Sequence, residues 1–298
     1  MAKLSRVTLT PRDLEILTLL DHVPMTPRQI QHASGSFGVS FPNEELVRRR
    51  LGRLRDSGLV RGFAYALPSA GRAPQYWKLT SRGYRQLYGA SVAMPSPRYF
   101  REIALGMHTH TSALADVVAH LMHCGARHDV QIDQFVRENA FTIEIGGFTL
   151  RPDAAFRLRR PAASERPYSF LVELDNGTER VRSTKDIESI ERKIRGYDLH
   201  QARYHRDDPA RYLVLFVTTR SEQRLESILG ACDHLIRNPD RTLFLGATLD
   251  QLLASDPFVE SVLLSNNGMN RTLIPRVPKP ATNTSAFGHP LSLYGQAA

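Results

Sequence analysis

Residues 170–179 of the chain read FLVELDNGTE. The stretch begins with apolar residues, as in a strand that enters a hydrophobic core, and Gly177 marks its end. Glu173 and Asp175 are two residues apart, so their side chains point to the same face of such a strand. Two neighbouring carboxylates repel each other unless a positive charge lies between them. The stretch therefore indicates either a bound cation or a strand end at which both charges are solvated.

Helix-like and strand-like runs follow one another in a regular order around this stretch. They are a helix at 109–124, strands at 130–139, 141–160 and 168–179, a long helix at 183–205, a buried strand at 211–220, a helix at 221–238 and a strand at 241–249. The order αβββαβ resembles the restriction-endonuclease-like core.

A second acidic residue, Asp153, lies in the stretch LRPDAAFRL at residues 150–158. A Pro-Asp on one strand and a Glu-x-Lys on its neighbour form the PD-(D/E)xK nuclease signature, which this pair of strands resembles. The resemblance implies that Asp and Glu hold Mg²⁺ and that a lysine orients or activates the attacking water. The chain departs from the signature at one place, because Asp175 stands where the lysine is expected.

Lys193 is the candidate for the missing lysine. It borders the apolar stripe of the long helix that follows Glu173, and a long ammonium side chain at such a border can lean over the strand ends. The stripe consists of Ile187, Ile190, Ile194 and Tyr197. Lysines on this helix occur in the nuclease superfamily that the chain resembles.

The first third of the chain holds all of its excess positive charge. Residues 1–98 contain 15 Lys and Arg and six Asp and Glu, whereas residues 99–298 contain 24 of each type. The net charge of +9 therefore belongs to one segment. Such a segregated excess is typical of a surface that binds a polyanion.

This basic segment has the element order of a small DNA-binding domain. Thr-Pro pairs at 10–11 and 26–27 predict two helix starts, and residues 41–60 predict a third helix that ends at Gly58. Two strands around a loop at 68–75 and a fourth helix at 81–89 follow. The segment closely resembles a winged helix-turn-helix domain.

The third helix of this segment is expected to present arginines to solvent. Its apolar residues fall on one side, and Arg48, Arg49 and Gly52 fall on the opposite side. Arginine suits both phosphates and guanine edges, so we expect contacts with double-stranded DNA. The expected contact residues are Arg48, Arg49, Arg53, Arg55 and, at the tip of the hairpin, Arg72. A solvated helix face and a winged helix that contacts only proteins remain alternatives.

Taken together, the motifs resemble the replication-relaxation family of bacterial plasmids and other mobile or chromosomal elements. The resemblance rests on Arg151-Pro152-Asp153-Ala154, on Glu173-Leu174-Asp175-Asn176-Gly177-Thr178-Glu179 and on Lys193 with Tyr197. It implies association with DNA in replication or mobilisation. The residues that it singles out as catalytic are Asp153, Glu173, Asp175, Lys193 and Tyr197, and the metal ligands would be Asp153, Glu173 and Asp175.

Composition places the chain among soluble globular proteins, with 42% hydrophobic and 23% charged residues. No apolar stretch approaches the ~20 residues that span a bilayer, and the first residues lack the apolar core of a signal peptide. Two cysteines indicate reduced thiols, so we expect a cytoplasmic protein with no membrane partner.

The sequence thus predicts an α+β or α/β chain with an N-terminal winged helix-turn-helix and a restriction-endonuclease-like αβββαβ domain. The expected division is 1–92 for the winged helix, 93–107 for a linker, 108–274 for the nuclease-like domain and 275–298 for a disordered tail. A zinc site among His108, His110, His120 and His123 is disfavoured, because only His120 and His123 share a helix at a spacing of three.

Three functions are compatible with these features. One is a DNA-binding protein of replication, mobilisation or transcription control whose second domain is a degenerate nuclease or a dimerisation and clamping unit. The second is a Mg²⁺-dependent DNA endonuclease that the winged helix directs to its site. The third takes Glu173, Asp175 and Glu179 as a solvated strand end. The absence of Glu-x-Lys favours the first, and the convergence of carboxylates with Lys193 favours the second over the third.

Overall fold

The N-terminal helices begin where the sequence predicts. In the computed structural model, the two helices are α1 (Pro11–His22) and α2 (Pro27–Ala33). Each has a threonine N-cap that forms a capping box, and each begins with proline in its first turn. Both caps satisfy amide groups that the first helical turn would otherwise leave unbonded. The structure describes residues 8–67, 73–138, 140–160, 167–181, 189–205 and 208–274.

A third helix and a hairpin complete the N-terminal part. Helix α3 (Glu44–Asp56) is followed by Gly58, whose φ of +71° stops the helix as predicted. Strands β1 (Val60–Ala64) and β2 (Gln75–Leu79) pair antiparallel, and α4 (Ser81–Tyr88) follows. The tip of this hairpin, which includes Arg72, lies outside the described residues.

The segment between the two halves contains two 3₁₀ turns, Pro97–Phe100 and Leu105–Met107. Tyr99 and Phe100 pack against the large hydrophobic cluster. The hydroxyl groups of Tyr88 and Tyr99 donate to Asp21 of α1 at 2.7 and 2.8 Å. Asp21 also pairs with Arg137 at 3.1 Å. These contacts tie α1, the segment after α4 and the end of β3 together.

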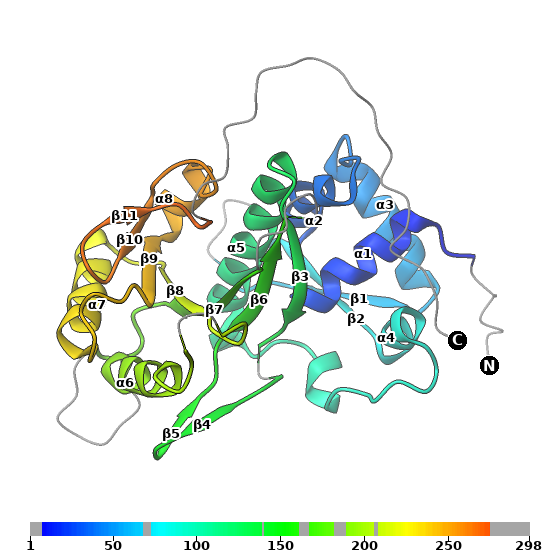
Figure 1. Ribbon diagram of the computed structural model, residues 1–298. Helices are drawn as coiled ribbons and strands as arrows, with labels where there is room; N and C mark the ends of the chain where they lie inside the picture. The colour runs from blue at the N-terminus through cyan, green and yellow to red at the C-terminus, as the bar shows by residue number, and fades with distance from the viewer. Residues whose placement is uncertain are drawn as a thin grey trace.

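A seven-stranded mixed sheet forms the second half (Figure 1), in the order β11-β10-β9-β8-β7-β6-β3. Strands β3, β6 and β7 pair antiparallel, β7, β8 and β9 pair parallel, and β10 returns antiparallel to β9 and pairs with β11. The strands are β3 (Gln131–Val136), β6 (Ala154–Arg159), β7 (Tyr168–Asp175), β8 (Leu213–Thr218), β9 (Phe244–Thr248), β10 (Leu263–Ser265) and β11 (Asn270–Arg271).

The prediction of a single strand at 141–160 is wrong. Strands β4 (Ile143–Ile145) and β5 (Phe148–Leu150) form a separate hairpin, and only β6 joins the large sheet. Gly146 and Gly147 turn the chain between them with φ values of +53° and +81°. Such angles are favourable for glycine and costly for other residues, so the Gly-Gly pair ends one strand and starts another.

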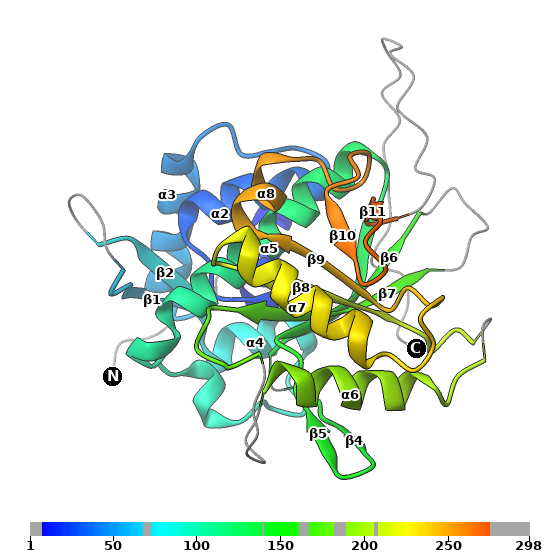
Figure 2. The same cartoon turned by 90° about the vertical axis from the view of Figure 1, so that its left-hand side faces the viewer.

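Helices cover both faces of the sheet. Helix α5 (His108–Arg127) packs in one cluster with Phe170, Val172 and Leu174 of β7. Helices α6 (Ile190–Gln201) and α7 (Glu222–Leu235) pack in a second cluster with Leu171 of the same strand. Figure 2 shows α7 lying across β8 and β9. Since strand residues alternate in direction, Glu173 and Asp175 belong to the face that α6 and α7 cover.

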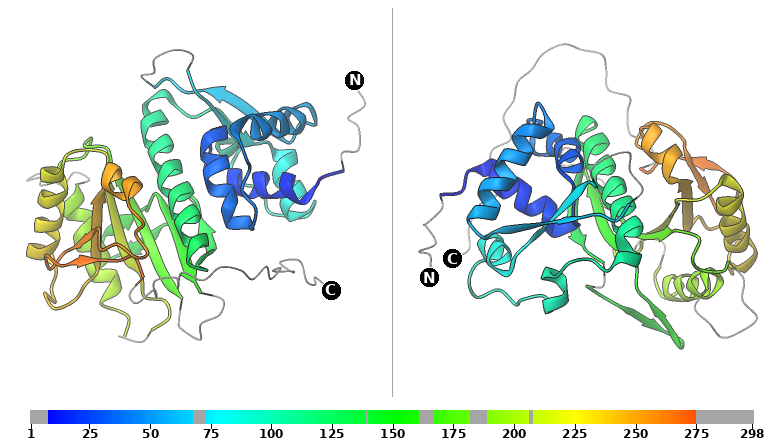
Figure 3. Two further views of the ribbon diagram at one scale, coloured as in Figure 1. Left: turned by 90° about the horizontal axis from the view of Figure 1, so that it is seen from above. Right: turned by 180° about the vertical axis from the view of Figure 1, so that it is seen from behind.

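Helix α5 also contacts the N-terminal helices, as the view from above shows (Figure 3). The Gln29 side chain of α2 donates to the Ser112 carbonyl at 3.1 Å and to Asp116 at 2.8 Å, both on α5. The same hydrophobic cluster contains residues of α1, α2, α3 and α5 together with strand residues of the sheet.

Several boundaries differ from the sequence-based expectation. Helix α6 starts at Ile190, with Ser189 as its N-cap, rather than at 183; residues 182–188 lie outside the described part. A short helix, α8 (Leu249–Ala254), and strands β10 and β11 were not predicted. The expected tail from 275 onward also lies outside the described residues. None of the described helices is long and apolar enough to cross a membrane.

Candidate functional site

The pairing of β6 with β7 brings two of the predicted acidic residues together. Ala154 lies opposite Val172. Asp153, the residue before β6, therefore lies beside Glu173, the residue after Val172 in β7. The amide of Asp153 donates to the Val172 carbonyl at 2.9 Å, and its Oδ2 accepts from the Leu174 amide at 2.7 Å. Backbone hydrogen bonds therefore fix the Asp153 carboxylate beside the C-terminal half of β7.

Glu173 is buried and has two side-chain partners from α6. Lys193 Nζ lies 3.0 Å from Glu173 Oε2, and the Tyr197 hydroxyl donates to Oε1. Burial raises the pKa of Glu173 to about 7, and the negative charge of Asp153 adds to this rise, while Lys193 and Tyr197 oppose it. The structure thus places Glu173, Lys193 and Tyr197 in one contact group next to Asp153.

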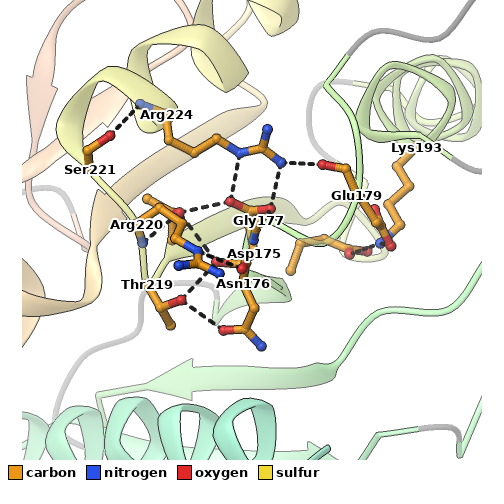
Figure 4. A network of polar contacts seen from close by, with 11 residues as sticks. Asp175, Asn176, Gly177, Glu179, Lys193, Thr219, Arg220, Ser221 and Arg224 are labelled. Atoms are coloured by element: carbon orange, nitrogen blue, oxygen red, sulfur yellow. Dashed lines mark hydrogen bonds and ion pairs between the residues drawn. The ribbon is translucent and has the colours of Figure 1, made fainter. Parts of the chain in front are cut away.

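Lys193 forms ion pairs with two carboxylates. Its Nζ atom also lies 3.0 Å from Oε1 of Glu179, which follows β7 in the loop (Figure 4). Burial lowers the pKa of Lys193, but the charges and hydrogen bonds of Glu173 and Glu179 outweigh burial and raise it. Lys193 is therefore a fixed cation, and its contacts compensate part of the negative charge of the site.

Asp175 is on the same face as Glu173 but has partners of its own. Arg224 of α7 binds both of its oxygens, at 2.9 and 3.0 Å (Figure 4). The Thr218 hydroxyl donates to Asp175 at 2.8 Å. Burial raises the pKa of Asp175, but hydrogen bonds from Arg224 and Thr218 outweigh it and lower the pKa. The cation beside Asp175 is therefore the guanidinium of Arg224, which sequence reasoning missed.

The other side of Asp153 faces a histidine and a glutamate. Ligand atoms of His110, Glu138 and Asp153 all lie within 4.8 Å of one another, the one such group of three among the described residues. His110 stands in the first turn of α5, and Glu138 follows β3. His110 Nε2 lies 3.2 Å from Asp153 Oδ1. Sequence reasoning grouped His110 with other histidines and did not single out Glu138.

The remaining histidines of the disfavoured zinc group have separate roles. His108 Nδ1 accepts from the Ala66 amide at 2.8 Å, and its Nε2 lies 3.1 Å from the Ile103 carbonyl. His120 Nε2 lies 2.8 Å from the Ser255 carbonyl. His123 stacks on His32 of α2 with ring centroids 4.2 Å apart. These histidines pack helix α5 against its neighbours.

A cavity of about 210 Å³ opens onto the site. Its walls include His110, Asp153, Glu173, Glu179 and Lys193. A space of this size admits water, an ion and a small polar group such as a phosphate. The charged groups of the strand ends are thus accessible to a ligand.

The predicted arginine face of α3 is exposed. Arg48, Arg49, Arg53 and Arg55 point to solvent, whereas Val47, Leu51 and Leu54 are buried. Arg48 pairs with Glu44 at 2.6 Å and Arg55 with Asp56 at 2.9 Å. Arg50 instead pairs with Asp13 of α1 at 2.9 Å. Arg72, the fifth predicted contact, lies outside the described residues.

Comparison with known proteins places the chain in a family. The family model described as Replication-relaxation matches residues 17–211, more than half of the chain. The chain belongs to the replication-relaxation family. The matched region includes Asp153, Glu173, Lys193 and Tyr197, whereas Arg224 lies beyond it. Membership of the replication-relaxation family indicates a role related to replication or mobilisation.

Two further comparisons add little to the family assignment. A crystal structure of Bacillus subtilis PadR in complex with operator DNA is similar at 16% identity, over 41% of this chain and 73% of that chain. Its TM-score of 0.26 is too low to support a conclusion. The search among curated proteins found no match.

Proposed function

We propose that this replication-relaxation protein binds double-stranded DNA through an N-terminal winged helix-turn-helix and cuts DNA with a restriction-endonuclease-like second domain. The observation that carries the proposal is the contact of Lys193 with Glu173 beside Asp153. A fixed ammonium group next to two strand-end carboxylates is the arrangement that the nuclease signature requires, with the lysine supplied by α6 instead of β7.

The arrangement of the second half supports this assignment. Helix α5, strands β3, β6 and β7, helix α6 and strand β8 follow one another in the order αβββαβ, with the β4–β5 hairpin inserted. The acidic residues lie at the end of the central strands, where loops leave the sheet open to a ligand. Backbone pairing fixes these residues in place, as phosphoryl transfer requires.

The proposed DNA contact rests on charge and exposure. The exposed arginines of α3 belong to the segment that holds all of the excess positive charge. Opposite to them, the apolar face of α3 is anchored in the core. A rigid helix with an arginine face can lie along the phosphates or enter the major groove.

The carboxylates near Asp153 fit a divalent cation. Burial is the main cause of the raised pKa of Glu173, and the charge of Asp153 adds to it against the effect of Lys193, so a cation beside Asp153 would relieve this repulsion. Asp153 would hold Mg²⁺ or a related ion, and Glu173, paired with Lys193, would lie beside it. Such an ion supplies Lewis-acid stabilisation of the phosphate and lowers the pKa of a bound water. Lys193 would hold Glu173 in position and donate to a phosphate oxygen or to the attacking water, and Tyr197 would fix the Glu173 carboxylate.

DNA binding without cleavage is the second candidate. Three ion pairs favour it: Arg224 neutralises Asp175, and Lys193 pairs with both Glu173 and Glu179. A site whose charges are compensated from within can be a structural relic. In that case the second domain serves as a clamp or an assembly surface for the DNA-binding half.

Supercoiled plasmid DNA with and without Mg²⁺ or Mn²⁺ tests the proposal. Wild-type protein is expected to convert the plasmid to the nicked or linear form only with a divalent cation. Asp153→Ala, Glu173→Ala and Lys193→Ala should abolish cutting, and Asp153→Ala should still bind DNA because α3 is unchanged. Cutting that persists in Asp153→Ala, or its absence with every cation and DNA supplied, would leave DNA binding as the function.

A further inference from the structure

Glu173 is poorly disposed to hold a cation, because both of its carboxylate oxygens already have partners. Lys193 binds Oε2 and the Tyr197 hydroxyl binds Oε1. An ion bound there would have to displace the ammonium group or lie against it, which like charges oppose. Asp175 is engaged in the same way by Arg224. Of the three predicted ligands, Asp153 alone has an oxygen that, among the described residues, faces neither an ammonium or guanidinium group nor a tyrosine hydroxyl.

That oxygen, Oδ1 of Asp153, faces the His110 side. The Nε2 atom of His110 lies 3.2 Å from it and is buried, yet it makes no hydrogen bond of acceptable geometry within the described residues. The two side chains thus form an ion pair without a well-aligned hydrogen bond, and a cation that replaced the proton of His110 would be ligated by both. A carboxylate oxygen of Glu138 completes the group of three atoms within 4.8 Å of one another.

The fold explains why these three residues meet. Strand β3 runs antiparallel to β6 with Val136 opposite Ala155, so the residues after β3 lie beside those before β6. Helix α5 begins next to this corner, and His110 stands in its first turn. His110 comes from α5, Glu138 follows β3 and Asp153 precedes β6. The hydrogen bonds between β3 and β6 hold the last two residues near each other.

We infer that His110, Glu138 and Asp153 form a divalent cation site that takes a first-row transition ion in preference to Mg²⁺. This inference deepens the proposed function, since it names the cation-binding residues of the proposed nuclease site and places Glu173 outside them. One nitrogen and two carboxylates suit first-row transition ions, whereas Mg²⁺ prefers oxygen ligands and retains its waters. Asp153 then links the ion on one side to the Lys193–Glu173 pair on the other.

Calorimetric titration of the full chain without DNA tests the site, with Mn²⁺, Co²⁺ and Mg²⁺ as probes. Co²⁺ is expected to bind more tightly than Mn²⁺, and Mn²⁺ more tightly than Mg²⁺, with one ion per chain. The visible absorption of Co²⁺ gives a second readout, because the position and intensity of its bands report the coordination number and geometry of the bound ion. Saturating Mn²⁺ should also raise the melting temperature of the wild type.

Variants separate this ligand set from the predicted one. His110→Gln, Glu138→Gln and Asp153→Asn should each weaken Mn²⁺ binding roughly tenfold or more. Glu173→Gln should leave the Mn²⁺ affinity within about twofold, because its oxygens are not ligands in this proposal. His123→Gln is the matched control, a histidine of the same helix outside the group, and should bind Mn²⁺ like the wild type.

The measurements distinguish a failure of the cation site from a failure of the proposed nuclease. Loss of Mn²⁺ binding in His110→Gln together with no cutting by any form would support the cation site and contradict the nuclease. Cutting by the wild type that His110→Gln retains, at unchanged Mn²⁺ affinity, would support the nuclease and overturn the cation site. A Mn²⁺ affinity that falls in Glu173→Gln but not in His110→Gln would also overturn it, and would return the ion to the predicted carboxylates.

Discussion

At the scale of single residues, the site is governed by how buried charges are paired. Glu173 lies on a core strand, and its pKa of about 7 lies above the ordinary value of 4.5 because burial penalises its charged form. Since the folded state keeps its proton to higher pH than the unfolded state, this carboxyl lowers the free energy of unfolding as pH rises from about 4.5 to about 7. Lys193 limits that loss by pairing with the ionised form.

Lys193→Met should therefore destabilise the protein in a pH-dependent way. At pH 8 the free energy of unfolding should fall by about 3 kcal/mol, because the variant must either bury an unpaired charge or protonate Glu173. At pH 5 the loss should be smaller, since Glu173 is already protonated in the folded wild type. Urea unfolding at the two pH values measures the difference.

The double variant Lys193→Met/Glu173→Gln is the control for this effect. It removes both charges, so it should recover stability at pH 8 relative to Lys193→Met alone. An equal loss at pH 5 and pH 8 would mean that Lys193 contributes by packing of its aliphatic chain instead of by charge.

At the scale of elements, helix α3 combines two faces with different tasks. The buried face of Val47, Leu51 and Leu54 anchors the helix. Arg50 lies at the border and forms a cross-helix pair with Asp13, whose pKa is lowered: burial raises it, but hydrogen bonds from Thr10 and Arg50 outweigh burial. Arg49 is exposed. Of these two adjacent arginines, Arg49 is therefore free to contact a ligand at the surface, whereas Arg50 stabilises the packing of α3 against α1.

Arg49→Ala and Arg50→Ala are predicted to give opposite results. Arg49→Ala should weaken DNA binding, by roughly 1–3 kcal/mol for a base contact or with a salt slope reduced by about one for a phosphate contact, at an unchanged melting temperature. Arg50→Ala should lower the free energy of unfolding by about 1 kcal/mol. Fluorescence anisotropy over a salt series and thermal unfolding measure the two effects. A fall in melting temperature for Arg49→Ala comparable with its loss of binding would assign that residue to the fold.

At the scale of the whole molecule, helix α5 joins the two halves. One face of α5 packs with the sheet, and its contacts with α2 include the hydrogen bonds from Gln29 to Ser112 and Asp116. The apolar residues of α1, α2 and α3 belong to the same cluster. A continuous core of this kind couples the stability of the N-terminal half to that of the sheet.

The full chain is therefore expected to unfold in a single transition. Trp77, the one tryptophan of the sequence, lies in β2 and reports on the N-terminal half, whereas circular dichroism reports on all helices and strands. The two melting curves should superimpose, and Gln29→Ala should shift both equally to lower temperature. The shift corresponds to about 1–3 kcal/mol, because Asp116 loses a partly buried hydrogen bond. A separate fluorescence transition would show that the halves unfold independently.

Local patterns determined much of the architecture in advance. Thr-Pro pairs at 10–11 and 26–27 fix helix starts through capping, and Gly58 stops α3, because each signal acts within a few residues of the chain. The alternation of apolar and acidic residues along β7 placed Glu173 and Asp175 on one face for the same reason. The Gly146-Gly147 turn was also visible, yet the apolar residues on both sides masked it.

Only the tertiary structure decided which charges meet. The sequence determined that Asp153, Glu173 and Asp175 are strand-end carboxylates and that Lys193 borders a helix stripe, since these are local properties. It could not assign Arg224 to Asp175 or Glu138 to His110, because those partners are 49 and 28 residues apart and come together only through strand register and helix packing. The same packing brings Lys193 into an ion pair with Glu173 and places His110 beside Asp153. Side-chain chemistry is local, but the charge balance of a site belongs to the fold.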